Sequence, residues 1–359
     1  MEFGLSQDQL QLQQSVARFL DEQVPLDAVR AFAEDRDDAR IRAGLAELGV
    51  SALLVPESTG GVGLTPLDAV VVMEALGARV VPSSFLTTSV LAPLAIHHAG
   101  LDDDDECAAL LAGIADGTLR VGAALGEAVA PRRDAGVDAA EGRLSGRALF
   151  AMGADADHWL VADRQRGLHL VAADAAGLTV RELTTIDRTR RTVELRFADT
   201  PARRLSEDPS VCTRVIDAGR VMLAADTLGA ASAMLDKSVV YAGERVQFNR
   251  PIGSFQAVKH MCAEMAAELE PCRSLVWYAG HALAEVPDEA PLVACHAKAL
   301  LAEVGTFVAK TATEVHGGMG FTDLVGLHYW FKRIGWNRQL LGAPELVREE
   351  AARLQGLVV

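Results

Sequence analysis

The hydrophobic pattern of this chain changes period twice, and this change limits the folds that the chain can adopt. Residues 119–206 carry short apolar runs separated by Gly and Asp, such as HWLVAD, GLHLVAAD and RTVELRF. These runs have the length and the alternation of β-strands. On both sides of them, apolar residues recur at the spacing of helices. We therefore predict a mainly α protein with a small inserted β domain.

The points at which the period changes divide the chain into three parts. We expect an N-terminal α-helical domain at 1–117, a shortened middle β domain at 118–207 and a C-terminal helix-bundle domain at 208–359. Ser6 is expected to begin the first helix, because Gln9 follows in the arrangement of a capping box. Residues 83–116 are predicted to be helical, with a solvated loop at the acidic run Asp102–Glu106. Further helices are predicted at 209–247, 254–285, 290–314 and 322–341, with a short tail helix from Pro344.

Composition argues against several classes of function. The chain has 34 Lys and Arg against 49 Asp and Glu, a net charge of −15, which disfavours nucleic acid as a partner. Its five cysteines are odd in number and form no CxxC pair, so we expect reduced thiols and no metal site. The N-terminus has no apolar core like that of a signal peptide, and no uninterrupted apolar run has membrane-spanning length. We therefore expect a cytoplasmic protein with no membrane partner.

One polar turn separates the first two long C-terminal helices. It lies in the stretch YAGERVQFNRPIGSFQAVKH at 241–260, where Pro251 and Gly253 favour a turn. Arg245 and Phe248 are expected at the end of the first helix, and Gln256 opens the next. A guanidinium can bind a pyrophosphate through two hydrogen bonds, and a phenyl ring offers a stacking surface. The turn can thus be a solvated connection or a nucleotide-binding elbow.

A second stretch, EVHGGMGF at 314–321, interrupts the last helical region. Three glycines within four residues allow backbone amides to approach a ligand closely, although the same residues can simply end a helix. His316, taken alone, is more typical of a packed or solvated histidine than of a catalyst.

Together these stretches resemble the acyl-CoA dehydrogenase family. The resemblance rests on ERVQFNRPIGSFQAVKH, on EVHGGMGF some fifty residues later and on LHYWFKR, with support from PESTGGVGLTPLDAVVVMEALG. It covers essentially the whole chain. It implies an N-terminal helical domain, a small middle β-barrel and a C-terminal four-helix bundle. It also implies a tetrameric flavoenzyme that oxidises the Cα–Cβ bond of an acyl-CoA, with electron-transferring flavoprotein as electron acceptor.

The resemblance assigns cofactor-binding roles to residues that reach across to the FAD of a neighbouring subunit. These residues are Arg245, Gln247, Phe248, Gln256, Glu314, Gly317 and Gly318. Glu314 stands where the family usually has Gln. A carboxylate near a pyrophosphate is unfavourable unless it is paired or turned away.

The catalytic base that the resemblance implies is missing. A glutamate removes the α-proton of the substrate from one of two places in the family fold, and these places correspond to Gly219 and Leu341. Neither residue can accept a proton, so no catalytic residue is assigned. Glu345 is a weak substitute, available only if the loop register shifts. The segments that would contact the flavin ring, 124–127 and 149–153, also lack the hydroxyls and the Trp of the family.

These absences lead to a hypothesis about the type of subunit. The chain resembles the non-catalytic, β-type subunit of bacterial α2β2 acyl-CoA dehydrogenases, some of which act on steroid side-chain CoA esters. A partner chain would then carry the base and the flavin ring. Two alternatives stay open: an active homotetramer that uses a displaced carboxylate such as Glu345, and a structural or regulatory partner that binds no flavin. The shortened middle domain and Gly219 are expected to widen the acyl cleft.

Overall fold

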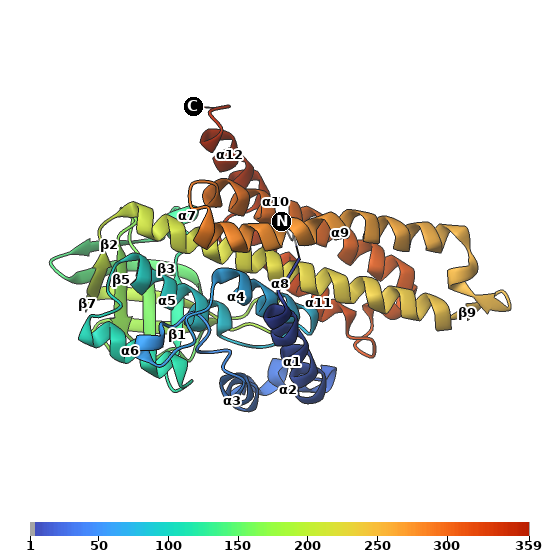
Figure 1. The fold of residues 1–359 in the computed structure, drawn as a ribbon, viewed down its shortest axis with the longest axis horizontal. Helices are drawn as coiled ribbons and strands as arrows, with labels where there is room; N and C mark the ends of the chain where they lie inside the picture. Colours follow the sequence, from blue (N-terminus) through green and yellow to red (C-terminus); the bar gives the residue numbers. More distant parts are fainter. Residues whose placement is uncertain (1–3, 359) are drawn as a thin grey trace.

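The N-terminal part of the chain is helical, as predicted, in the computed structural model, which describes residues 4–358 (Figure 1). Its elements are α1 (Gln7–Gln23), α2 (Leu26–Asp35), α3 (Ala39–Glu47), η1 (Glu57–Thr59), α4 (Pro66–Ala78), the π-helix η2 (Phe85–Leu91), α5 (Ala92–His98) and α6 (Asp105–Ala115). The Ser6 hydroxyl accepts a hydrogen bond from the Gln9 amide at 3.2 Å, and the Gln9 side chain accepts one from the Ser6 amide at 3.0 Å. The predicted capping box is therefore confirmed.

The helical region expected over 83–116 is observed, and a loop interrupts it close to the acidic run where one was expected. The chain forms η2, α5 and α6 in succession, and Asp104 caps α6 by accepting the amide hydrogens of Glu106 and Cys107, both at 3.1 Å. Asp and Asn side chains favour such caps over helix interiors, and this explains the break.

The middle part folds into one eight-stranded sheet. Its elements are β1 (Val121–Ala124), α7 (Gly126–Val129), β2 (Gly136–Ala140), β3 (Arg143–Met152), β4 (His158–Ala162), β5 (Leu168–Ala172), β6 (Leu178–Leu183), β7 (Thr192–Pro201) and β8 (Arg203–Ser206). The strand order is β6-β7-β3-β1-β4-β5-β8, with β2 paired to β3. No pairing within residues 4–358 joins β6 to β8. The sheet is therefore an open path that begins with β6 and ends with β8.

Both faces of the sheet are covered. Along β4, Trp159 and Val161 pack into a core that lies within the β domain, whereas Leu160 and Ala162 pack into the main core that the helices share. Successive strand residues point to opposite faces of the sheet. One face therefore packs against the helices, and the other packs against the core of the β domain.

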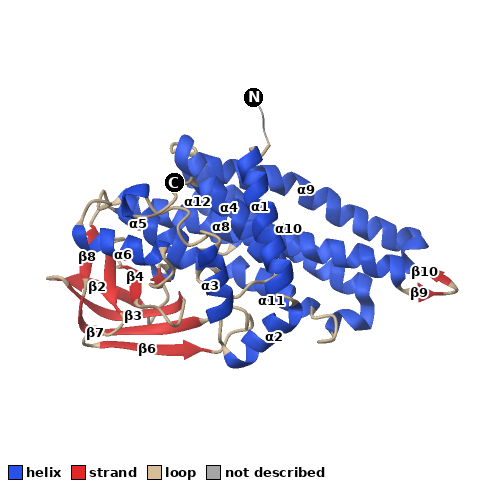
Figure 2. Cartoon of the chain, turned by 60° about the horizontal axis from the view of Figure 1, so that its bottom comes forward, coloured by secondary structure: helices blue, strands red, loops and turns tan. Residues whose placement is uncertain are grey.

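The C-terminal part is a bundle of long helices. Its elements are α8 (Pro209–Glu244), β9 (Val246–Gln247), β10 (Arg250–Pro251), η3 (Ile252–Ser254), α9 (Gln256–Glu285), α10 (Ala290–His316), η4 (Gly317–Phe321), α11 (Leu327–Gln339) and α12 (Pro344–Leu354). Figures 1 and 2 both show the hairpin β9–β10 at one end of the bundle and the large sheet at the opposite end of the molecule. The segment Ala290–Phe321 is long and apolar enough to cross a membrane, but 61% of its most apolar window is buried. Packing of α10 inside the bundle accounts for its composition.

Candidate functional site

The polar turn forms a small β-hairpin, which differs from the helix-turn-helix expected from the sequence. Helix α8 ends at Glu244, and the Arg245 carbonyl accepts a hydrogen bond from the Ile252 amide at 2.8 Å. Phe248 does not end the helix: it lies at the tip of the hairpin with φ of 52° and is 88% exposed. Its ring meets Phe255 edge to face, with 6.0 Å between the centroids. The hairpin therefore offers the exposed ring of Phe248 at its tip and the exposed guanidinium of Arg245 at its base.

The structure brings the hairpin and the glycine segment together. The ring of Tyr241, one turn before Arg245, stacks on His316 with 4.6 Å between centroids and an angle of 22°. Gly317 follows directly, with φ of 58°, and a Cβ added at Gly317 or Gly318 would meet no atom within 4 Å. The backbone of these two glycines is therefore uncovered on the side where a Cβ would lie, while the Gly317 amide donates to the Glu314 carbonyl.

His316 has a structural role. It is buried, its Nδ1 lies 2.7 Å from the Ala312 carbonyl oxygen, and burial lowers its pKa. The packed histidine expected from the sequence is thus observed.

The other predicted cofactor residues lie on the same end of the bundle. Gln247, Gln256 and Glu314 are exposed, and the Gln247 amide donates to the Val246 carbonyl at 2.8 Å. Within residues 4–358, neither Arg245 nor Glu314 takes part in an ion pair of 4 Å or less. The Glu314 carboxylate is therefore not neutralised within the chain. The Arg245 guanidinium is exposed and forms no hydrogen bond with the described residues.

The two positions implied for the catalytic base meet in space, and an apolar side chain fills the space between them. A methyl group added at Gly219 would overlap Cδ1 of Leu341 and would lie 3.4 Å from Cδ2 of Leu91. Leu341 is only 4% exposed. The expectation that Gly219 widens an acyl cleft is therefore wrong at this point, because Leu341 occupies the room that the glycine leaves.

Two buried cations hold the loop that carries Leu341. The Arg220 Nε donates to the Leu341 carbonyl at 3.1 Å, and the Lys298 Nζ donates to the carbonyls of Gly342 at 3.1 Å and Asn337 at 2.9 Å. Leu341 sits at a φ of 52°, which a leucine adopts only when its surroundings impose it. Burial lowers the pKa of Lys298 to about 7. The loop is therefore fixed with its leucine turned inward.

The acidic residues near these positions do not replace the base. Glu345 begins the first turn of α12, has a side chain that is 72% exposed and pairs with Arg338 at 3.1 Å. Asp217 is buried and pairs with Arg220 at 3.2 Å, and burial raises its pKa to about 7. It lies two residues before Gly219 and so points to a different face of α8.

The two segments expected near a flavin ring contact each other instead. Glu127, in the first segment, accepts a hydrogen bond from the Leu149 amide at 3.3 Å and pairs with Arg132 at 2.7 Å. The Arg132 guanidinium covers the Phe150 ring at 4.9 Å, and Phe150 meets Trp336 at 5.6 Å. Sequence reasoning missed Arg132 and Trp336, because neither belongs to a local motif.

Sequence reasoning also missed a buried ion network that joins the domains. The Arg333 guanidinium donates to Asp187 at 3.0 Å, to Asp226 at 3.1 Å and to the Thr189 hydroxyl at 2.5 Å. Asp226 also accepts from Asn337 at 2.5 Å. The network ties the β6–β7 loop to α8 and α11, and its members lie too far apart in the sequence to form a motif.

The fold and these two ends of the bundle identify the chain as a member of the acyl-CoA dehydrogenase family. Models of that family match its N-terminal domain at residues 6–118 and its C-terminal domain at residues 210–355. The chain is 32% identical over 356 residues to acyl-CoA dehydrogenase IpdE2 of Mycobacterium tuberculosis, covering 97% of this chain and 96% of the relative.

Two solved structures are similar over nearly the full length. A chain of the Tcur3481-Tcur3483 steroid ACAD is 30% identical, covers 97% of this chain and 98% of its own, and gives a TM-score of 0.88. A chain of the ChsE4-ChsE5 complex of Mycobacterium tuberculosis is 26% identical, covers 100% of both chains and gives a TM-score of 0.91. Helical outer domains around a middle β region, as the resemblance implied, are confirmed.

Proposed function

We propose that this chain is the non-catalytic subunit of an α2β2 acyl-CoA dehydrogenase and completes an FAD site whose base and ring-binding residues belong to a partner chain. The observation that carries the proposal is the packing of Leu341 over Gly219, since it fills both positions from which a base would act. FAD, when bound, supplies the hydride acceptor for oxidation of the Cα–Cβ bond. This chain contributes Arg245, Phe248 and the uncovered backbone of Gly317 and Gly318.

The length of α8 supports a site shared between chains. Arg245 follows Gly219 by 26 residues, a distance of about 39 Å along the helix. Proton and hydride transfer need reacting atoms within about 3–3.5 Å. A flavin held by Arg245 therefore cannot react at the base positions of the same chain.

A second copy of this chain would not complete the site either. Each copy has the same contact between Glu127 and Leu149 and the same stack of Arg132, Phe150 and Trp336. These contacts occupy the segments that would face the flavin ring. The occupied segments favour a different partner chain over a homotetramer. A homotetramer would also lack a base, because Glu345 is exposed and pairs with Arg338.

The relatives support both a heteromeric assembly and a steroid substrate. One solved neighbour is a steroid ACAD made of two named proteins, and another comes from a complex of two proteins. We therefore propose that the acyl group is a steroid side-chain CoA ester. Electron-transferring flavoprotein is the proposed electron acceptor, as the family resemblance implies.

Flavin stoichiometry tests the proposal. The chain is purified alone and after co-expression with a related acyl-CoA dehydrogenase that retains its glutamate base, and the mass and flavin absorbance of each sample are measured. We expect little flavin on the chain alone, and one flavin per pair of chains in an α2β2 complex.

Two results would count against the proposal. A yellow homo-oligomer that oxidises an acyl-CoA without a partner would support the alternative hypothesis of an active homotetramer. A stable complex that keeps its full flavin content when Arg245 is replaced by Ala would favour a structural partner that binds no flavin.

A further inference from the structure

The outward face of the middle domain carries charged side chains that the sites described above do not use. Along β7, Val193, Leu195 and Phe197 pack into the core of the β domain, so Glu194 and Arg196 point to the opposite face. Within the described chain, no residue of β6 or β7 belongs to the core that the helices share. Figure 2 shows β6 and β7 at the edge of the molecule. The face that carries Glu194 is therefore directed to solvent.

One carboxylate on this face pairs with three arginines, Arg147, Arg181 and Arg196, which we call the arginine cluster. The Nε atoms of Arg181 and Arg196 each donate to Glu194 at 2.8 Å, and Nε of Arg147 lies 2.5 Å from it. Glu194 is fully buried because these exposed guanidiniums cover it. Burial alone would raise the pKa of Glu194, but hydrogen bonds from the three arginines lower it to about 2. The carboxylate therefore stays ionised and holds the three side chains in place.

The strand register places like charges next to each other in the arginine cluster. Arg147 on β3 lies directly opposite Arg196 on β7, and Arg181 on β6 lies opposite Glu194. Like charges directly opposite each other on a sheet are unfavourable. Three guanidiniums and one carboxylate leave a local charge of +2. A further anion at this position would therefore be favourable.

The other acidic residues on the strands of the cluster pair with other arginines. Asp199 on β7 pairs with Arg143 at 2.7 Å, and Glu182 on β6 pairs with Arg191 at 2.8 Å. Strand β3 carries no acidic residue. None of these strands therefore offers a second carboxylate that is free to neutralise the arginine cluster.

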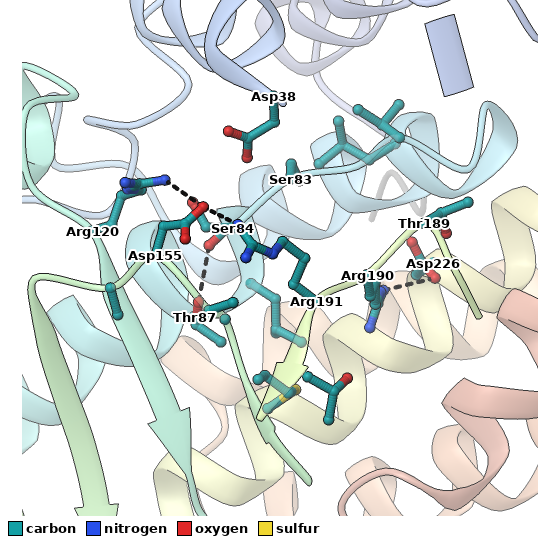
Figure 3. A pocket seen from close by; sticks show the side chains of 18 of the residues that line it. Asp38, Ser83, Ser84, Thr87, Arg120, Asp155, Thr189, Arg190, Arg191 and Asp226 are labelled. Atoms are coloured by element: carbon teal, nitrogen blue, oxygen red, sulfur yellow. Dashed lines mark hydrogen bonds and ion pairs between the residues drawn. The ribbon is translucent and has the colours of Figure 1, made fainter. Parts of the chain in front are cut away.

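Arginines at the junction of the middle domain with the helices are matched by nearby acids (Figure 3). Arg190 pairs with Asp226 at 3.0 Å, and Arg191 pairs with Asp155 as well as with Glu182. The arginine cluster differs, because its three members share a single carboxylate. Exposed charges more than about 8 Å apart are largely screened at physiological salt, so distant acids do little to cancel the cluster.

The terminal nitrogens of the cluster are available to a ligand. Within residues 4–358, neither terminal nitrogen of Arg147 or Arg196 donates a hydrogen bond, and neither does Nη1 of Arg181. The planar guanidinium fork matches the oxygens of a phosphate. A phosphate monoester carries a charge of about −1.5 to −2 at pH 7, which balances the cluster. A carboxylate, with one negative charge, would leave half of the local charge in place.

We propose that the arginine cluster binds the phosphate group of a small phosphorylated molecule. Glu194 orients the guanidiniums, and the terminal nitrogens of Arg147, Arg181 and Arg196 donate to the phosphate oxygens. The site lies within one chain. It does not depend on the shared FAD site proposed above, so the two proposals can fail separately.

Calorimetric titration of the full-length chain with sodium phosphate, and separately with glycerol 3-phosphate, tests the site. We expect saturable binding of one phosphate group per chain with a Kd below about 1 mM at physiological salt. Arg147→Gln and Arg196→Gln each remove one cation and its donors from the cluster. Either change should therefore weaken the binding of both probes by about tenfold.

Arg143→Gln is the matched control. It lies on β3 like Arg147 and removes the same charge from the chain, but it pairs with Asp199 outside the cluster. Its affinity for both probes should stay within about twofold of the original chain. Circular dichroism checks that each variant is folded, and the more exposed Arg196→Gln keeps the test valid if Arg147→Gln does not fold.

Vesicles that contain phosphatidic acid distinguish a lipid headgroup from a free phosphate. Co-sedimentation of the chain with these vesicles, without binding of either free probe, would overturn the proposal, because the cluster would then contact a membrane surface. The absence of saturable binding to both probes would also overturn it. So would equal affinities in the original chain and in the folded cluster variants, or an equal loss in Arg143→Gln. Binding of a free probe that weakens in the cluster variants alone supports the proposal.

Discussion

The two ends of α8 serve different purposes. Near its N-terminal end, Gly219 is covered by Leu341, and Arg220 and Lys298 hold the covering loop through buried hydrogen bonds. At its C-terminal end, Arg245 and Phe248 are exposed on a hairpin that projects from the bundle (Figure 2). The first end is a closed protein interior, and the second is an exposed surface.

This difference separates stability from function within one helix. Buried side chains that hydrogen-bond or pack against each other contribute to the folded state, and replacing them lowers the free energy of unfolding. Exposed side chains without internal partners contribute little to folding. We therefore expect changes at the closed end to affect stability and changes at the exposed end to affect flavin.

Replacing Arg333 by Met should have the largest effect on stability. Asp187 and Asp226 would lose their shared cation while staying buried, which costs about 3–5 kcal/mol. Urea unfolding of the original chain and the variant measures the loss. Arg353→Met, which breaks an exposed pair with Glu349 on α12, should change the free energy of unfolding by less than about 1 kcal/mol. Equal losses in both variants would show that the buried network does not hold the domains together.

A double-mutant cycle tests whether Leu341 truly fills the room over Gly219. Leu341→Ala should cost about 2–4 kcal/mol by leaving a cavity, and Gly219→Ala about 1–3 kcal/mol by overpacking. The double variant should cost less than the sum, because the new methyl fills part of the new cavity. Additive losses, measured by the same urea unfolding, would contradict the contact.

Most helices and strands of the chain could be predicted from the sequence, but the packing of Leu341 over Gly219 could not. Apolar period and caps predicted α1 and α8, and alternation predicted six strands. Strand β2 was missed because GVDAA contains mostly small residues, and β8 because RRLS has no alternating pattern. Helix α11 begins at Leu327, later than predicted, since Gly326 adopts a left-handed conformation.

Candidate site residues could be proposed from the sequence where a local motif carried them. Arg245 and Gly317 belong to such motifs, and the structure brings their segments together through the stacking of Tyr241 on His316. The ring stack and the network of Arg333 join residues distant in sequence, and a single sequence contains no signal for such pairs. The spatial meeting of Gly219 and Leu341 followed from the family resemblance; the filling of the space between them is visible only in the structure.

Replacing Arg245 by Ala should affect flavin without affecting stability. A hydrogen bond to a charged group contributes about 1.5–3 kcal/mol, so flavin affinity of the co-expressed complex should fall at least about tenfold. The free energy of unfolding of the isolated chain should change by less than about 0.5 kcal/mol, because Arg245 is exposed. Flavin absorbance after gel filtration and urea unfolding measure the two effects. Arg133→Ala, an exposed arginine of the middle domain, is the control and should leave both unchanged.

The pH dependence of the closed end gives a further test of the comparison. Burial raises the pKa of Asp217 from 3.8 to about 7, so the folded chain binds its proton more tightly than the unfolded chain does. The resulting stability is fully present below about pH 4 and is lost as the pH rises through about 7, with a slope of at most about 1.4 kcal/mol per pH unit. Asp217→Asn removes this titration, so unfolding free energies at pH 5 and pH 7.5 should differ less in the variant than in the original chain. Asp236→Asn, on the exposed face of the same helix, should keep the original difference. Identical pH profiles for the original chain and Asp217→Asn would mean that the carboxyl of Asp217 is solvated, and that the closed end of α8 is more open than its packing indicates.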